Sequence, residues 1–305
     1  MTSYIKVRIG LASALLLAAS LSVQAAQVGI ASGNPTGTNY PMVEDIIKVC
    51  STPTSPIHNV VSDGSLDNIA KIYSDKSTQY GIFQADAGEY MKGQDPKMME
   101  RILMVFPFFS TEMHLISKEG SNITALASLA GKRVVEGPEG SGTWVSAQVI
   151  KSLTGIKWTP ILASQQAGFD MVIAGTADAE FIVAGAPVKL LQTGKGFKLV
   201  PMSHPALDSF GLYTKALIPS GMYPSSKGTV STYKVDNILG TYAFKSQYQA
   251  EIGALVSCLA KNVDKLQTEA GFHPKWRDVS IVDIGRIKWQ AHPAAVQAIK
   301  KASKK

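Results

Sequence analysis

Two glycine-rich loops, each of which follows a short apolar strand pattern and opens a helical pattern, constrain the fold of this chain most. The first loop runs from Gly33 to Thr38 (GNPTGT) and follows a strand pattern at 28–31. The second runs from Gly137 to Thr143 (GPEGSGT) and follows a strand pattern at 133–136. Strands that alternate with helices predict an α/β fold with a parallel sheet and right-handed crossovers. Because the two loops belong to separate units, we expect two α/β lobes.

The segments around the two loops support this interpretation. After the first loop, apolar residues at helical spacing (Val43, Ile46, Ile47 and Cys50) predict an amphipathic helix. The βαβαβ pattern of this unit continues with a strand at 59–61, a helix from 65 and a strand at 81–84. The second unit is expected to contain helices at 123–129, 143–154 and 169–174 and strands at 133–136, 180–183 and 198–200.

The two loops also contain the groups that could bind a ligand. A strand-to-helix loop leaves backbone N–H groups unpaired at the positive end of the helix dipole, where a carboxylate or phosphate can be held. Glycine allows a ligand to approach the backbone, and Ser or Thr adds a hydroxyl donor. A single loop of this kind is more often a tight turn with an ordinary N-cap. Two in matching places, at the carboxyl ends of strands, favour a cleft that binds a small anion.

Several other sites are excluded or disfavoured. Gly137 and Gly142 have the GxxxxG spacing of a phosphate-binding P-loop, but Thr143 and Trp144 stand where that motif requires Lys and Ser or Thr. Neither loop has a clean GxGxxG dinucleotide pattern, and no GxSxG nucleophile motif is present. The histidines show no paired metal-ligand spacing: His58, His114, His204, His273 and His292. We therefore expect no cofactor and no metal.

The N-terminus predicts export. Lys6 and Arg8 precede an apolar run at 11–21, and small residues follow at 23–26. This is typical of a signal peptide that is cleaved, with a membrane anchor as the alternative. We expect residues 1–26 to be removed and the mature protein to be periplasmic. Loss of Lys6 and Arg8 from the 30 basic residues leaves 28 against 23 acidic residues, a net charge of +5 that does not indicate a nucleic-acid partner.

Cys50 and Cys258 are the two cysteines of the chain. In an oxidising compartment their natural interpretation is a structural disulfide. Two buried free thiols, or one reactive nucleophile, are the alternatives, although neither cysteine lies in a CxxC motif.

The motifs together resemble those of the TAXI solute-binding proteins of TRAP transporters. The segment at 29–41, with IASG and TGTNYP, is similar to the opening loop of that family. The other matches run in order along the chain: GSLDN at 64–68, GIFQAD at 81–86, GKRV at 131–134, GPEGSGT at 137–143, FIVAGAP at 181–187, MYP at 222–224 and HP at 292–293. Asn34-Pro35 and Ala85 depart from the family pattern at positions where ligand contacts are expected.

The resemblance implies a type II periplasmic-binding-protein fold, in which two α/β lobes joined by crossing strands close around a ligand cleft. We expect lobe 1 at 27–113 with 235–305 and lobe 2 at 114–234. The resemblance also implies a sodium-coupled TRAP membrane subunit as partner and a small organic anion such as glutamate or a dicarboxylate as ligand. We expect a monomer that is not an enzyme. A periplasmic sensor subunit that binds the same ligand class is the alternative, followed by an enzyme on the same scaffold.

The residues that match the family motifs are the candidate ligand contacts. They are Thr36, Gly37, Thr38, Asn39, Tyr40, Gly64, Ser65, Gln84, Ser141, Gly142, Thr143, Gly185, Ala186 and Pro187. Tyr40 is interpreted either as a ligand contact or as a core aromatic residue. Glu112, near the expected first crossing, is interpreted as an exposed carboxylate, with a role in the hinge as the alternative.

Overall fold

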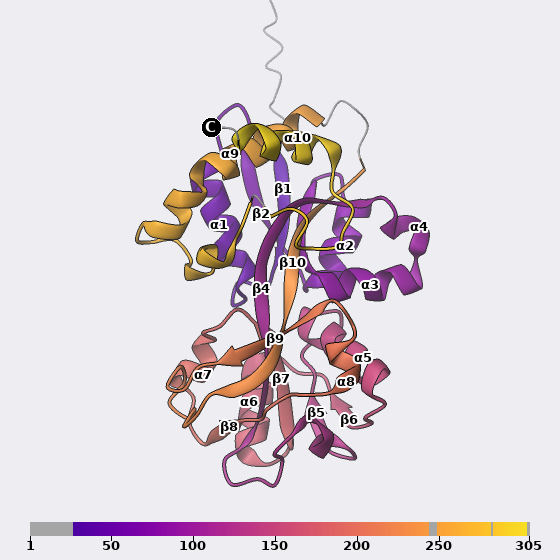
Figure 1. The fold of residues 1–305 in the computed structure, drawn as a ribbon, viewed down its shortest axis with the longest axis vertical. Coiled ribbons are helices and arrows are strands. Elements are labelled where there is room, and N and C mark those ends of the chain that lie inside the picture. The colour runs from indigo at the N-terminus through magenta and orange to yellow at the C-terminus, as the bar shows by residue number, and fades with distance from the viewer. Residues whose placement is uncertain (1–26, 244–248, 282, 304–305) are drawn as a thin grey trace, which may run out of the picture.

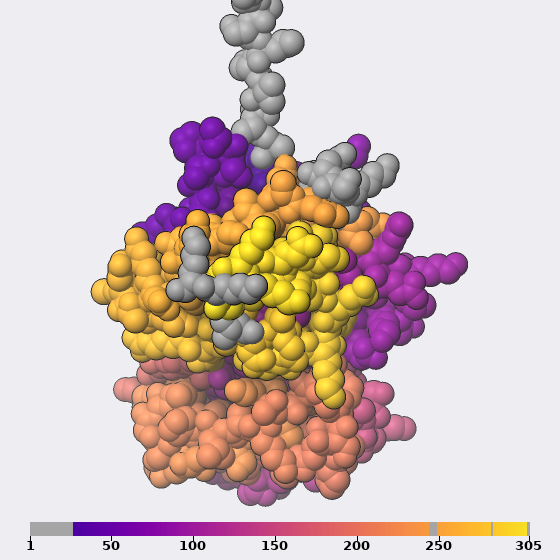
Figure 2. All heavy atoms as spheres, turned by 45° about the horizontal axis from the view of Figure 1, so that its top comes forward, coloured from indigo at the N-terminus to yellow at the C-terminus, as the bar shows by residue number. Residues whose placement is uncertain are grey.

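The computed structural model describes residues 27–243, 249–281 and 283–303, so the expected signal peptide at 1–26 lies outside the described residues. The described chain forms two α/β lobes, stacked one above the other in Figure 1. On the face drawn in Figure 2, the C-terminal segments cover the upper lobe and adjoin the orange segments of the lower one.

Lobe 1 begins with alternating strands and helices. These are β1 (Val28–Gly33), α1 (Asn39–Cys50), β2 (Ile57–Val61), α2 (Ser65–Ser74), β3 (Tyr80–Gln84), α3 (Ala85–Gln94) and α4 (Pro96–Met99). β1 is buried along its whole length and lies between β2 and β3, parallel to both. The βαβαβ unit predicted from the sequence is therefore confirmed.

A long strand, β4 (Ile102–Lys118), then carries the chain into lobe 2. That lobe contains η1 (Leu126–Leu129), β5 (Arg133–Val135), α5 (Gly142–Thr154), β6 (Thr159–Ile161), α6 (Gln165–Ala174), β7 (Ala179–Ala184), α7 (Lys189–Thr193), β8 (Phe197–Leu199), α8 (Pro205–Asp208) and β9 (Tyr213–Ile218). α5 and α6 end at Gly155 and Gly175, which adopt the left-handed conformation that glycine favours at helix ends. The helix expected at 123–129 is a single 3₁₀ turn over its second half.

The chain returns to lobe 1 through a second long strand. β10 (Val230–Tyr242) leads to α9 (Gln249–Thr268), η3 (Pro274–Asp278) and α10 (Pro293–Ala302). The sheet order is β2-β1-β3-β10-β4-β7-β5-β6, with β8 paired to β4 and β9 paired to β10. β10 and β4 are antiparallel to each other, and they insert between the parallel strands of the two lobes. The sheet is thus mixed.

The expected lobe boundaries fall within these crossing strands. Met113 lies in β4 and pairs with Val183 of β7, whereas Val235 lies in β10 and pairs with Thr111 of β4. Figure 1 shows both strands passing without interruption from one lobe to the other. Any movement of one lobe relative to the other must therefore bend or twist β4 and β10.

The disulfide predicted from the sequence is present in lobe 1. Cys50, at the end of α1, is bonded to Cys258 in α9, and their Cα atoms are 5.9 Å apart. The bond lies beside an apolar cluster that includes Ile46, Leu255 and Leu259. Two helices distant in the sequence are joined where their apolar faces already pack.

None of the described helices combines the length and the apolar character that crossing a bilayer requires.

Candidate ligand-binding cleft

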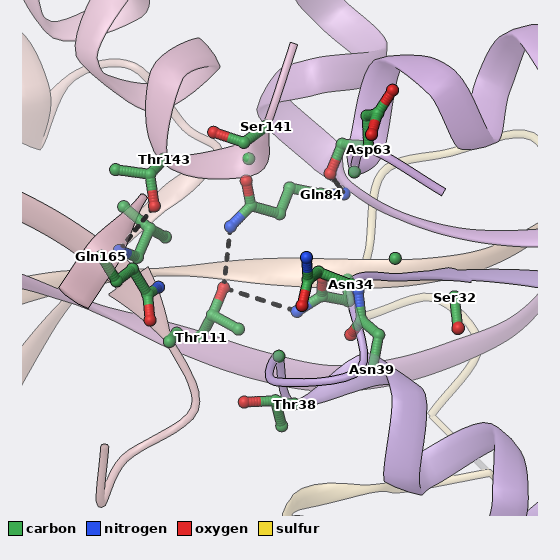
Figure 3. A pocket seen from close by; sticks show the side chains of 18 residues that line it. Ser32, Asn34, Thr38, Asn39, Asp63, Gln84, Thr111, Ser141, Thr143 and Gln165 are labelled. Carbon is green, nitrogen blue, oxygen red and sulfur yellow. Dashed lines mark hydrogen bonds between the residues drawn. The ribbon is translucent and has the colours of Figure 1, made fainter. Parts of the chain in front are cut away.

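A cavity of about 140 Å³ lies at the junction of the two lobes. The crossing strands supply Thr111 and Asn237, and loops and helix ends of both lobes supply the remaining walls (Figure 3). Pockets that bind drug-sized ligands typically measure roughly 300–1,000 Å³, so this cavity has room only for a smaller molecule. The lining residues are Ser32, Gly33, Asn34, Gly37, Thr38, Asn39, Asp63, Gly64, Ser65, Gln84, Thr111, Ser141, Gly142, Thr143, Gln165, Val183, Ala184 and Asn237.

Four helices begin at this cavity. The first residues of α1, α2, α5 and α6 all line it. Neither Thr38 before α1 nor Gly64 before α2 makes a side-chain cap to its helix, so the first-turn N–H groups of these helices lack that partner. The cavity therefore lies at the positive ends of several helix dipoles, which favours negative charge.

The lining contains no fixed positive charge. Among the described residues around the cavity there is no Lys, Arg or His, and Asp63 is the one acidic residue. The carboxylate of Asp63 is exposed and points away from Gln84 and Thr111 (Figure 3). Backbone dipoles and neutral donors are thus the attractive groups for an anion in this cavity.

Two threonine hydroxyls are oriented by backbone bonds. Thr143 Oγ1 accepts a hydrogen bond from the N–H of Val183 at 3.0 Å, and Thr38 Oγ1 accepts one from the N–H of Gly185 at 3.3 Å. Because each hydroxyl oxygen is occupied as an acceptor, its proton remains able to donate. One such donor comes from each lobe.

A polar network crosses the floor of the cavity. Gln84 Nε2 donates to Thr111 Oγ1 at 3.1 Å, and Asn237 Nδ2 donates to Phe109 O at 3.0 Å and to Thr111 Oγ1 at 3.4 Å (Figure 3). Gln84 is only 4% exposed, and its Oε1 has no hydrogen-bond partner. A β carbon on Gly142 would lie 2.2 Å from this Oε1. Residue 142 must therefore be glycine for Gln84 and α5 to approach this closely.

The lobes touch beside the cavity. The N–H of Leu66 donates to Gly140 O at 3.2 Å. Asp86, at the start of α3, accepts hydrogen bonds at Oδ2 from Ser146 Oγ of α5 at 2.6 Å and from Tyr213 OH of β9 at 2.9 Å. The described structure is thus a closed arrangement of the lobes.

Asp86 is fully buried in this contact. Its Oδ1 has no hydrogen-bond partner. Burial raises the pKa of the Asp86 carboxyl to about 6, although the hydrogen bonds from Ser146 and Tyr213 oppose the shift. The contact between the lobes thus contains a carboxyl that resists ionisation.

Glu112 is not the exposed carboxylate expected from the sequence. Its side chain is 15% exposed, and Oε1 lies 2.8 Å from Nζ of the buried Lys275 in η3. Its Oε2 accepts a hydrogen bond from the N–H of Ala186 at 2.7 Å. Since Lys275 belongs to lobe 1 and Ala186 to lobe 2, Glu112 links the lobes at the hinge. That interpretation was the alternative, and the contacts support it.

The cavity brings together nine of the fourteen candidate residues: Gly37, Thr38, Asn39, Gly64, Ser65, Gln84, Ser141, Gly142 and Thr143. The other five, Thr36, Tyr40, Gly185, Ala186 and Pro187, lie outside its lining.

Local bonds account for most of these five positions. Thr36 is exposed, and both its N–H and its hydroxyl bond to Asn34 Oδ1, which turns it toward its own loop. The N–H of Gly185 reaches Thr38 without residue 185 lining the cavity. Ala186 and Pro187 instead line a separate cavity with Glu112 and Lys275. Tyr40 is half-buried, and its carbonyl accepts a hydrogen bond from Asn59.

The prediction missed the polar residues of the crossing strands. Thr111 and Asn237 sit in strands that are otherwise largely buried, and a polar residue inside an apolar strand run was the available signal. Ser32 lies near the end of β1, just before the first glycine-rich loop, and Gln165 is the first residue of α6, whose preceding loop was not among the predicted ligand contacts.

A protein-family model matches residues 30–300, which is most of the chain. This chain belongs to the NMT1-like family. Membership in the TAXI family, expected from the motifs, stays a prediction.

Solved structures resemble the NMT1-like chain along most of its length. A structure described as a periplasmic transporter has 12% identity and a TM-score of 0.52, with 91% of this chain and 93% of that chain covered. The amino acid ABC transporter substrate-binding protein AbpA from Streptococcus pneumoniae, bound to L-arginine, has 11% identity and a TM-score of 0.51, with 92% and 97% covered. A structure from the glutathione import system of GshT and TcyBC in Streptococcus mutans has 14% identity and a TM-score of 0.51, with 86% and 99% covered. Similarity at this level establishes the fold, and the expected type II periplasmic-binding fold with two α/β lobes is confirmed.

Proposed function

We propose that this NMT1-like protein is a periplasmic solute-binding protein that captures a small organic anion between its lobes and delivers it to a membrane transporter. The observation that carries the proposal is the cavity at the lobe junction, around which four helices begin. The fold shared with a periplasmic transporter and with an amino acid ABC transporter substrate-binding protein supports the same class.

The chemistry of the lining supports an anion. A carboxylate at the N-termini of α1 and α2 would accept hydrogen bonds from first-turn N–H groups that no side chain caps, apart from that of Leu66, which already donates to Gly140 O. Thr38 and Thr143 would add one hydroxyl donor from each lobe. Asn39, Ser65 and Gln165 would give the remaining polar contacts. A molecule the size of glutamate or a short dicarboxylate suits these donors, and the motifs that resemble the TAXI family favour a TRAP membrane subunit as the recipient.

Binding between two lobes explains why the lining residues come from both lobes. Neither lobe alone surrounds the cavity, since the loops at 33–39 and 63–65 belong to lobe 1 and those at 141–143 to lobe 2. A ligand that contacts both sides stabilises the closed arrangement, and a closed protein is what a membrane partner can distinguish from an open one.

The experiment has two steps. Small molecules released on denaturation of the purified mature protein are identified by mass spectrometry, and the released compound is then titrated calorimetrically alongside glutamate, 2-oxoglutarate, succinate and malate. Thr38→Ala and Thr143→Ala should each weaken binding roughly ten- to a hundredfold, because a hydrogen bond to a charged group contributes about 1.5–3 kcal/mol. Thr193→Ala, at an exposed position in α7, is the matched control. Tight binding of only neutral or cationic solutes would contradict the proposal, as would an anion that binds the parent and both cleft variants equally.

A further inference from the structure

A second cavity, of about 270 Å³, lies on the opposite face of the crossing strands. Successive residues of a strand point to opposite faces of the sheet. Thr111 and Asn237 point into the ligand-binding cleft, and their neighbours Ser110 and Asp236 line the second cavity. The two cavities are therefore separated by the thickness of the sheet.

The second cavity is strongly basic, unlike the cleft. Its lining includes the cations Lys234, Arg286 and Lys288 against one carboxylate, Asp236. Asp236 is already engaged, since Ser110 Oγ donates to its Oδ1 at 2.6 Å and Arg286 Nη1 lies 3.6 Å from the same oxygen. The cavity consequently carries an excess of positive charge.

Neither lysine of this cavity has an acidic partner among the residues that the structure describes. No ion pair between described residues includes Lys234 or Lys288. Glu112 stands opposite Lys234 in the β4–β10 pairing, but its carboxylate is occupied by Lys275 and by the N–H of Ala186. Positive side chains gathered in a hollow raise the local concentration of anions.

Arg286 gives the cavity a fixed cationic wall. Its Nη2 donates to Phe108 O at 2.6 Å, which anchors the guanidinium to β4, and its buried Nε has no hydrogen-bond partner. Lys234 is half-buried in β10, next to Thr214 of β9 in the strand pairing. Both lobes thus contribute, with Arg286 and Lys288 from the C-terminal region of lobe 1 and Thr214 from lobe 2.

We propose that this hinge cavity is a second anion site, separate from the ligand-binding cleft, which takes a compact oxoanion such as inorganic phosphate or a small carboxylate. Lys234 and Lys288 are its principal charge partners, because Arg286 is already committed in part to Asp236 and Phe108. Thr214 adds a hydroxyl group to the lining, whereas the hydroxyl of Ser110 already donates to Asp236.

The test is a calorimetric titration of the folded mature protein with inorganic phosphate at low ionic strength, with acetate as a parallel titration. The parent is expected to bind one phosphate, and the double variant Lys234→Gln/Lys288→Gln to bind it at least tenfold more weakly. The control Lys300→Gln/Lys301→Gln removes two exposed lysines from α10 and should leave the affinity unchanged. A parent that binds acetate but not phosphate identifies a carboxylate as the oxoanion.

Three results would overturn the proposal. The parent could bind neither anion, both lysine double variants could weaken binding equally, or Thr143→Ala in the cleft could abolish phosphate binding while Lys234→Gln/Lys288→Gln leaves it intact. The last result would place phosphate in the cleft and would leave the proposed solute-binding function standing. Circular dichroism of each variant confirms that it is folded.

Discussion

Gly64 of lobe 1 and Ser141 of lobe 2 approach so closely that a β carbon on Gly64 would lie 2.9 Å from the Cα of Ser141. Real β carbons essentially never come this near another heavy atom. Gly64 also has a φ of +128°, a backbone conformation that residues with a side chain rarely adopt. The two lobes close onto a position where no side chain is tolerated.

Gly64→Ala should therefore hold the lobes apart. We expect the released metabolite to bind at least tenfold more weakly and small-angle scattering to show a larger radius of gyration. Gly120→Ala is the control, because Gly120 also has a positive φ, of +79°, but nothing lies within 4 Å of its β position. If both variants bind the metabolite as the parent does, the contact between Gly64 and Ser141 is not needed for closure.

Asp86 should make stability depend on pH in a defined direction. Its pKa is about 6 in the folded protein, against 3.8 ordinarily, so the folded state holds a proton that the unfolded state releases. The contribution of this group to the free energy of unfolding therefore falls as the pH rises from about 4 to about 6, and it stays low at higher pH. Asp86→Asn removes this titration, so its stability relative to the parent should increase across the window, as measured by urea unfolding at pH 4.5 and 7.5.

The exposed substitution Asp283→Asn is the control for Asp86→Asn. It should show the same difference from the parent at both pH values. A difference between Asp86→Asn and the parent that does not change with pH would mean that Asp86 is ionised in the folded protein throughout.

Glu180, the second residue of β7, should make stability depend on pH in the same direction as Asp86 does, over a wider pH range. Both of its carboxylate oxygens are buried without a partner, and burial raises its pKa to about 9, with a smaller contribution from Asp170. Glu180→Gln should stabilise the protein by an amount that grows with pH above about 4.5. The gain at pH 7.5 should reach about 1–3 kcal/mol in urea unfolding, since each unit of pKa corresponds to about 1.4 kcal/mol at most. Glu139→Gln, at an exposed loop position, should show no such growth.

The disulfide between Cys50 and Cys258 should account for a large part of the stability of lobe 1. It closes a sequence separation of 208 residues, and removal of a native disulfide typically costs about 2–5 kcal/mol. The Cys50→Ala/Cys258→Ala variant should unfold at a correspondingly lower urea concentration. The denatured, unreduced parent should contain no free thiol. Two reactive thiols in the parent would contradict the bond.

The local features of the fold could be predicted from the sequence, and the long-range ones could not. The strand before Gly33 and the helices after Thr38 and Ser141 follow from periodicity and loop chemistry within about twenty residues. The pairing of β10 between β3 and β4 depends on segments more than a hundred residues apart, and no local pattern encodes that register. The family resemblance predicted crossing strands, but not which of their residues point into the cleft.

The residues of the candidate site show the same contrast between local and long-range features. Thr38, Gln84 and Thr143 lie at the ends of locally predictable elements, and all three line the cavity. Thr111 and Asn237 reach it only because β4 and β10 pair, so they could not be placed before the structure was known. Ala186 and Pro187 lie beyond the cleft because the N–H of Ala186 bonds to Glu112, a contact between residues 74 positions apart.

The position of β10 also governs the order in which the protein can be completed. In the sheet of lobe 1, β10 lies between β3 and β4, although it is translated after β5 to β9 of lobe 2. A ribosome that has produced the chain up to Ile218 has therefore made β5 to β9 of lobe 2, while β3 still lacks the neighbour on one of its edges. The lobe that is begun first is the last to be finished, and a chain that terminates before Val230 leaves an open edge in the lobe that carries the first glycine-rich loop.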